Sequence, residues 1–376
     1  MSRKCPITLI ALFCAANLSL KAQESTSVFN FLNLPTSSHA TALGGKNISL
    51  IEDDISLAFH NPALLSSVSD KTLGLNFMTF MKGAKNGSAS YAQHAGKRGT
   101  WGAGVQFVGY GSMQETSASG EVLGTMSDLD MAVSGTYSYM LGENWAGGAS
   151  GKIIYSHYGE FTSCALAVDL GINYFLEEKD FSLSAAARNI GGQVKSFADH
   201  HERLPFDLEV GFTKGLGHAP IKFSLTLVDL TRWSSDDYFS AGKKTSNGRI
   251  FTNHFNLGVD ITPTHLFYVA AGYNFRRAYE MKAAGSSHAA GLSFGAGLNL
   301  NRIKDSSNAS RMVLVELCNY HIIDLGDALL CEILKDLIVV IIFSRINKNC
   351  LKRQRRLNKN GITLTNIQEN DATKWI

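Results

Sequence analysis

Short runs in which apolar and polar residues alternate one by one dominate the middle of this chain of 376 residues. The most regular of them fall at residues 131–139, 166–174, 206–212, 255–261 and 292–300. Alternation with a period of two places successive side chains on opposite faces of a β-strand. Each run is about ten residues long, which is the length a tilted strand needs to cross a lipid bilayer. The pattern predicts an all-β chain.

The alternation template predicts twelve strands. They cover approximately residues 73–80, 87–95, 100–110, 129–140, 145–156, 163–175, 181–189, 206–213, 221–229, 251–261, 266–275 and 289–301. If the amino terminus is periplasmic, every second connection is short, and the long connections at 111–128, 190–205, 230–250 and 276–288 share the other side. A soluble β-sandwich has no reason to sort its loops in this way. The prediction is an antiparallel outer-membrane β-barrel in the cell outer membrane, spanning residues 73–304.

Composition and charge support this class and exclude others. Hydrophobic residues make up 45% of the chain and charged residues 18%, with 35 glycines and 6 prolines. This balance, without a long apolar block, argues against disorder and against a bundle of membrane helices. The body between residues 23 and 304 holds 22 basic and 24 acidic residues. A nucleic-acid-binding protein needs a basic face, so we expect no nucleic-acid partner.

The first 22 residues have the pattern of a secretory signal peptide. Arg3 and Lys4 precede an apolar stretch at residues 7–20, and the small residue Ala22 follows at a suitable cleavage position. The alternative is a transmembrane anchor, but Asn17 interrupts the apolar stretch before it reaches spanning length. We therefore expect cleavage after residue 22 and export of the remainder.

Residues 23–72 precede the first strand and do not alternate. The pairs that stand out are Gly44-Gly45, Asp53-Asp54 and Asn61-Pro62. The glycine pair lacks the strand-then-helix context of a phosphate-binding loop, and an asparagine followed by proline is a turn signal. A compact segment ahead of a barrel that is wide enough to have a lumen is most simply a hatch inside it.

These hatch motifs resemble the PorV/PorQ group of outer-membrane proteins of the type IX secretion system. Residues 27–35, reading SVFNFLNLP, and residues 204–207, reading LPFD, look closer to the PorQ branch. The resemblance covers about residues 25–301. It implies a barrel of about fourteen strands with an amino-terminal hatch, similar in architecture to FadL-type barrels. It also implies a non-enzymatic role, in which the barrel anchors a PorZ-like surface protein. That partner belongs to a complex with PorU and PorV that processes secreted cargo and attaches it to lipopolysaccharide.

The tail, residues 305–376, departs from this pattern. It does not alternate, although the resemblance implies two strands beyond the twelve that can be recognised. Our hypothesis is that the reading frame shifts, or a foreign sequence joins, near Lys304. A barrel that ended there would leave an unpaired edge in lipid, which is costly. The alternative is an accessory segment that packs beneath the barrel.

We predict no catalytic, cofactor or metal site. Residues 199–202, reading DHHE, resemble a metal cluster, but neighbouring residues of an extended loop point in opposite directions, so a solvated loop is the better interpretation. Asp207, Glu209 and Asp260 face the lumen by alternation, as the polar interior of such barrels requires. No motif marks a nucleophile, so the alternative of an outer-membrane hydrolase is set aside and the chain is expected not to be an enzyme.

Lys152 and Asp169 lie on neighbouring predicted strands and both face the lumen. Folding the hairpin near Gly159 brings them roughly diagonal to each other, which predicts an ion pair across the two strands. The alternative is that the two side chains are hydrated separately.

Two long outer loops combine aromatic and charged residues, as interface anchors often do. The candidate partner residues are Arg232, Trp233, Tyr238, Arg276, Arg277 and Tyr279. They are candidates for contact with a surface protein or with outer-membrane lipid, the alternative being loops that are merely solvated. The predicted function is the anchor implied by the resemblance. The alternative is a FadL-like passive transporter of small hydrophobic molecules, which needs a continuous apolar pocket through the lumen. The polar inward-facing residues favour the anchor.

Overall fold

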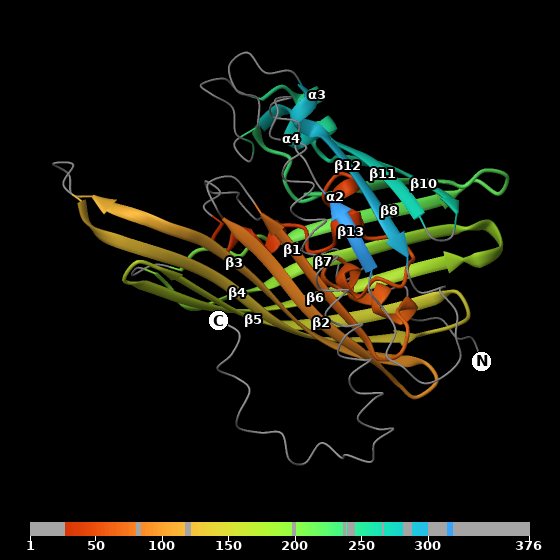
Figure 1. Cartoon of the computed structure of the whole chain (residues 1–376), viewed down its shortest axis with the longest axis horizontal. Coiled ribbons are helices and arrows are strands. Elements are labelled where there is room, and N and C mark those ends of the chain that lie inside the picture. The colour runs from red at the N-terminus through yellow and green to blue at the C-terminus, as the bar shows by residue number, and fades with distance from the viewer. Residues whose placement is uncertain are drawn as a thin grey trace, which may run out of the picture.

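The structure, a computed structural model, is one antiparallel sheet that curls around a small helical segment (Figure 1). It describes residues 27–79, 84–116, 122–197, 201–235, 238, 245–264, 267–280, 288–299 and 314–318. The predicted signal peptide lies outside the described residues, and so does the tail except for one short strand. Each of the thirteen strands pairs with its neighbours in chain order. This up-and-down connectivity is the one expected of an outer-membrane barrel.

All twelve strands predicted from the alternation are present, and a thirteenth lies in the tail. They are β1 (Thr72–Thr79), β2 (Lys85–Ala95), β3 (Gly99–Thr116), β4 (Val122–Met140), β5 (Trp145–Tyr158), β6 (Phe161–Leu176), β7 (Phe181–Lys195), β8 (Asp207–Gly215), β9 (Ile221–Leu227), β10 (Phe255–Thr264), β11 (Phe267–Asn274), β12 (Leu292–Asn299) and β13 (Leu314–Cys318). Because β13 pairs antiparallel with β12, part of the atypical tail continues the sheet.

Several predicted boundaries are wrong, including the end of β7, which continues from the predicted residue 189 to Lys195. The predicted loop at 111–128 is largely strand, because β3 and β4 continue their pairing to Thr116 and from Val122. Strand pairing is made by backbone hydrogen bonds, so it continues where the apolar alternation has stopped. The predicted strand at 251–254 is the end of helix α3 (Asn247–Asn253) and its cap, and residues 289–291 belong to the short helix η7 (His288–Gly291).

The two faces of the sheet have opposite character. Apolar side chains such as Leu166 (54% exposed) and Val133 (47%) point outward from the convex face. Acidic side chains such as Asp130 and Asp169 are fully buried on the concave face. A soluble protein would bury the first set and expose the second. An outer-membrane barrel turns its apolar side chains toward lipid and its polar ones toward the lumen. Within the described residues, no helix has both the length and the hydrophobicity to span a membrane.

Residues 27–71 form the hatch, which lies on the concave side of the sheet (Figure 1). Its helical turns are η1 (Asn30–Asn33), α2 (Ser38–Ala42), η2 (Ile55–Phe59) and η3 (Pro62–Ser67). The remaining helices are η5 (Glu177–Lys179), in a short turn, and α4 (Phe275–Glu280), which packs against α3 on the side of the long loops. This segment precedes the sheet, and β1 begins at Thr72, one residue before the predicted start of the barrel at residue 73.

Inward-facing glycines of the wall form a seat for the hatch. At seven of them, an added Cβ atom would come within 3.0 Å of a hatch atom. They are Gly74, Gly104, Gly148, Gly171, Gly211, Gly258 and Gly272. Since these glycines come from β1, β3, β5, β6, β8, β10 and β11, the hatch touches the wall around most of the sheet. Close approach of one backbone to another is what a glycine in a strand permits.

Candidate functional site: a fastened hatch and a cap of outer loops

The acidic pair of the hatch motif holds the hatch in shape. Asp54 caps η2, accepting hydrogen bonds from the Ser56 amide at 2.8 Å and from the Ser37 hydroxyl at 2.7 Å. Asp53 accepts a hydrogen bond from the Ser69 amide at 2.6 Å. A side chain that caps a helix satisfies an amide that otherwise has no partner. Both carboxylates therefore have structural roles.

Asn61 and Pro62 begin the helical turn η3. The Asn61 side chain accepts a hydrogen bond from the Ala63 amide at 3.0 Å and donates one to the Ile48 carbonyl at 2.9 Å. Pro62 occupies the first turn of the helix, where its missing amide hydrogen is not needed. This pair sits directly against the wall, because a side chain at Gly171 would overlap Asn61.

Gly44 and Gly45 terminate α2. Their φ angles are 105° and 101°, a region that glycine enters without steric penalty. The chain turns here against β11, where the Asn274 amide donates to the Gly44 carbonyl at 3.1 Å. A side chain at Gly272 would overlap the same turn. All six residues of the predicted hatch motif thus shape or seat the hatch.

An ion network fastens the hatch to β7 and β8. Lys46 of the hatch meets Asp207 at 2.5 Å and Glu209 at 3.0 Å, and Glu209 also meets Arg188 at 3.4 Å. Arg188 in turn donates to the Leu32 carbonyl of the hatch at 3.1 Å. The two carboxylates are buried, so neither is screened by solvent. Two of the three lumen-facing acids predicted from the alternation, Asp207 and Glu209, are therefore the partners of a hatch lysine.

The charges of this network act on the ionisable groups of the hatch. Burial alone would lower the pKa of Lys46, but Asp207 and Glu209 outweigh it and raise that pKa above its ordinary value. His60, also buried, has its pKa well below the ordinary value because of desolvation and the nearby cation of Arg188. Lys46 is therefore charged and His60 neutral near pH 7.

The predicted ion pair between Lys152 and Asp169 is confirmed. Their charged atoms lie 2.5 Å apart, and the register places Asp169 opposite Ser150, diagonal to Lys152. A bulge in β7 adds to the pair: Asn189, with a φ of 57°, donates its amide to Asp169 at 2.7 Å. The extra residue lets Arg188 and Asn189 both face the lumen.

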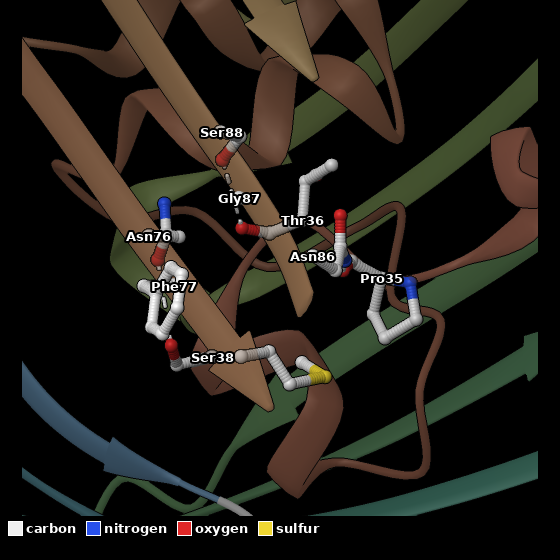
Figure 2. Close-up of a pocket in the computed structure, with 9 residues that line it drawn as sticks. Pro35, Thr36, Ser38, Asn76, Phe77, Asn86, Gly87 and Ser88 are labelled. Carbon is white, nitrogen blue, oxygen red and sulfur yellow. Dashed lines mark hydrogen bonds between the residues drawn. The ribbon is translucent and has the colours of Figure 1, made fainter. Parts of the chain in front are cut away.

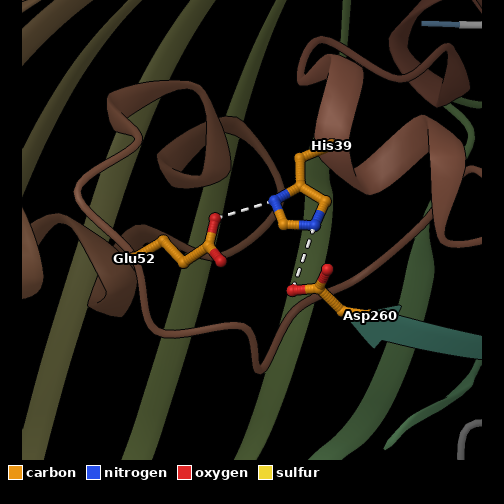
Figure 3. A group of neighbouring side chains, drawn as sticks. All are labelled: His39, Glu52 and Asp260. Carbon is orange, nitrogen blue, oxygen red and sulfur yellow. Dashed lines mark hydrogen bonds and ion pairs between the residues drawn. The ribbon is translucent and has the colours of Figure 1, made fainter. Parts of the chain in front are cut away.

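A histidine and two carboxylates form a second link between hatch and wall (Figure 3). His39 of α2 lies 2.7 Å from Glu52 through Nδ1 and 3.5 Å from Asp260 of β10 through Nε2. Its ring stacks on Tyr268 of β11 with centroids 4.0 Å apart. Burial alone would lower the pKa of His39, but the two carboxylates outweigh it and raise that pKa well above the ordinary value.

The hatch also joins the first strands of the sheet. Figure 2 shows a small cleft where residues 35–38 approach β1 and β2. Asn86 donates to the Pro35 carbonyl at 3.2 Å, and Ser88 donates to the Thr36 carbonyl at 3.5 Å. The cleft is lined by both the hatch and the wall, so it belongs to the seam between them.

One side of the lumen is apolar and is covered by the first residues of the hatch. Phe29, Phe31 and Leu32 pack in a buried cluster with wall residues that include Val108 and Ile154. These contacts remove apolar surface from water. This cluster departs from the polar lumen predicted from the sequence, and so does a second one that joins Leu43 of the hatch to Tyr268 of β11.

The described parts of the two long loops after β9 and β11 lie together as a cap on the side of the long connections. Arg276 joins them: its guanidinium meets Asp229 at 2.6 Å and Glu280 at 3.0 Å, and lies 5.3 Å from the Tyr238 ring centroid. Arg277 donates to the carbonyl of Ala290 at 2.9 Å. Two arginines predicted to contact a partner are thus engaged within the cap.

The other candidate partner residues divide between the interior and the surface of this cap. Tyr238 is buried and donates to the Arg232 carbonyl at 2.8 Å. The Tyr279 ring lies 4.4 Å beneath the Arg249 guanidinium. Trp233 remains 52% exposed. The structure brings all six candidates into one cap, although most of them stabilise it rather than face outward.

Sequence reasoning missed the residues that fasten the hatch. His39, Lys46 and Glu52 were given no role, because no local pattern links a hatch residue to a strand more than 150 positions away. The sequence indicated only that Asp207, Glu209 and Asp260 face the lumen, because they fall on the inward positions of their alternating strands. The predicted DHHE loop lies partly outside the described residues, and His201 and Glu202 are not part of any cluster described above.

No protein-family model matches the chain, and no curated protein sequence matches it. Solved structures similar to it include the Pseudomonas putida toluene transporter TodX, at 12% identity and a TM-score of 0.46, covering 72% of this chain and 90% of that one. The monoaromatic hydrocarbon channel CymD is also similar, at 12% identity and a TM-score of 0.45, covering 73% and 91%. A Pseudomonas aeruginosa FadL homologue follows at 11% identity and a TM-score of 0.42, covering 71% and 87%.

The class of the protein follows from its own residues. An antiparallel sheet with apolar side chains outside, polar side chains inside and an amino-terminal hatch is an outer-membrane β-barrel. At such low identity, the likeness to the solved barrels concerns the fold alone.

Proposed function

We propose that this protein is an outer-membrane barrel that is plugged by its hatch and that anchors a surface partner through its cap. The observation that carries the proposal is the fastening of the hatch: Lys46 is held by Asp207 and Glu209, in a lumen where the hatch is seated against glycines. A hatch held in this way favours a rigid plug over a gate. The resemblance of the hatch motifs to the PorV/PorQ group suggests the partner, a PorZ-like protein of the type IX attachment complex.

The cap supplies the surface for such a partner. Arg276 and Arg277 join its inner residues, so the described part of the cap is held in place before binding. Binding to a preformed surface avoids the entropy of ordering it. Trp233 and Phe251 of the cap remain 52% and 55% exposed. Exposed aromatic residues on a rigid surface are typical centres of binding energy.

Replacing Trp233 with alanine is therefore expected to release the partner without unfolding the barrel. The protein would be extracted gently from the outer membrane and captured through a tag in the turn between β8 and β9. A large surface protein should be recovered with the unaltered chain and fall at least tenfold with Trp233→Ala, since a central aromatic contributes about 2 kcal/mol or more.

The matched control is Leu141→Ala, which removes an exposed side chain (59%) from a short turn at the opposite rim. The control should leave recovery of the partner unchanged. Equal recovery with Trp233→Ala, or loss with both variants, would contradict a binding surface at the cap.

A second candidate is passage of small hydrophobic molecules, the activity by which TodX and CymD are described. For this chain, the observation in its favour is the apolar cluster inside the lumen. Withdrawal of Phe29, Phe31 and Leu32 would expose an apolar wall at Val108 and Ile154. Mass spectrometry of small molecules retained by the same captured protein separates the candidates. A stoichiometric hydrophobic ligand with no protein partner would favour transport.

A further inference from the structure

The cluster formed by His39, Glu52 and Asp260 has the composition of a metal site. Each residue offers one ligand-type atom, and these atoms all lie within 4.8 Å of one another. Figure 3 shows that the three side chains come from different places: His39 and Glu52 from the hatch, and Asp260 from the wall. Imidazole and carboxylate together suit a first-row divalent cation.

The hydrogen bond to Glu52 prepares the histidine for a metal. Glu52 lies 2.7 Å from Nδ1, so Nδ1 keeps its proton when a metal ion displaces the proton of Nε2, and Nε2 then becomes the electron-pair donor. In metal sites, the second nitrogen of a ligating histidine commonly donates to a carboxylate in this way, which fixes the ring and strengthens the ligand. Glu52 is therefore the orienting residue, and Nε2 the ligand.

On the other side of the ring, the distance between Nε2 and Asp260 matches the distance between two ligands of one ion. Nε2 and the nearer oxygen of Asp260 are 3.5 Å apart. A charge-assisted hydrogen bond would be closer, at about 2.8 Å. Two ligands at about 2.1 Å from a tetrahedral zinc ion lie about 3.4 Å from each other. The observed separation fits two ligands of one ion better than it fits a direct ion pair.

Asp260 supplies a second, independent observation. Its side chain is 2% exposed, and among the described residues neither carboxylate oxygen accepts a hydrogen bond of normal geometry. A buried carboxylate is unfavourable unless a positive charge neutralises it, and a divalent ion at Nε2 would take over this role from the proton of His39. A divalent ion at Nε2 would satisfy both of its oxygens.

We infer that His39 Nε2 and the Asp260 carboxylate bind a first-row divalent cation, with zinc the best fit, and that Glu52 orients the histidine. Two protein ligands leave the remaining coordination positions of the ion to water. The ion joins α2 of the hatch to β10 of the wall. This inference does not depend on the anchoring role, because an ion in this position fastens the hatch whatever the barrel does.

The test is zinc binding by the full-length protein purified in detergent without a chelator. After incubation with zinc and dialysis, the unaltered chain should retain about one zinc ion by elemental analysis. His39→Gln and Asp260→Asn should lose it, and Glu52→Gln should weaken affinity by about 10- to 100-fold, as loss of an orienting partner does. Asp53→Asn, a hatch carboxylate outside the cluster, is the matched control and should bind zinc normally.

A second readout guards against variants that fail to fold. Zinc in large excess should raise the urea midpoint of the unaltered chain and of Asp53→Asn, because a ligand of the native state stabilises it. It should leave Asp260→Asn unchanged. No retained zinc in the unaltered chain, or equal retention by Asp260→Asn, would overturn the metal site. The cluster would then be a protonated histidine held between two carboxylates.

Discussion

Replacing Gly148 with valine is expected to unseat the hatch, whereas the same replacement at Gly151 of the same strand is expected to be tolerated. A side chain at Gly148 would overlap the backbone of Pro62 and Ala63 in the hatch. A side chain at Gly151 would meet nothing within 4 Å. Overpacking against a backbone that cannot move aside costs about 3 kcal/mol. Valine on the outward face of a strand is favourable or neutral.

The two variants would be compared with the unaltered protein by urea unfolding and by ion conductance of the purified barrel. Gly148→Val should lower the urea midpoint and increase ion conductance across a planar bilayer, because a displaced hatch opens the lumen. Gly151→Val should match the unaltered protein in both. If Gly148→Val had unchanged stability and conductance, the glycine seat would not hold the hatch.

Replacing Lys46 with methionine should destabilise the barrel strongly, because it leaves Asp207 and Glu209 buried beside each other without the hatch cation. Removing one partner of a buried ion pair costs about 3 to 5 kcal/mol. Arg188 remains near Glu209 at 3.4 Å, so the loss is expected at the lower end of this range. The measurement is urea unfolding of the barrel in detergent micelles.

The matched control for this variant is Lys85→Met. Lys85 lies on β2 and is exposed, so its removal should change the free energy of unfolding by about 0.5 kcal/mol or less. Equal effects of the two substitutions would show that the ion network does not fasten the hatch.

The strands were predictable because their signal is local. A period of two specifies which residues face lipid and which face the lumen, and it needs no knowledge of the neighbouring strands. The ion pair between Lys152 and Asp169 was predictable for a related reason, since a hairpin fixes its own register. The long hairpin of β3 and β4 was missed because apolar and polar residues do not alternate regularly in its outer part, and backbone pairing does not require that alternation.

The close contact between hatch and wall is reflected in the sequence by glycines at lumen-facing positions of the strands. Gly171, Gly211 and Gly258 fall on the lumen-facing positions of their strands by simple alternation. A glycine at a position that faces the interior suggests that another backbone approaches there. The glycine content of the chain was therefore informative about the hatch as well as about the strands.

The fastening itself could not be predicted from the sequence. Lys46 meets Asp207 across 161 positions, and no periodicity connects a lysine in an irregular segment with a strand so far along the chain. The same holds for His39 and Asp260. The composition of the cap loops was recognised, but its arrangement was not, because Arg276 and Arg277 bind within the cap instead of facing outward.

The most direct test of the anchoring account is to lock the hatch to the wall with a disulfide and to measure whether partner binding or uptake of a small molecule is lost. The hydroxyls of Ser49 in the hatch and Thr213 in β8 lie 2.9 Å apart, so cysteines at these two positions are close enough to be joined. Recovery of the surface partner and uptake of a small hydrophobic probe would be measured before and after oxidation. Full partner recovery with the hatch locked, and no uptake in either state, is the result expected of an anchor. Uptake that oxidation abolishes, with no partner recovered in either state, would contradict the account and assign the barrel to transport.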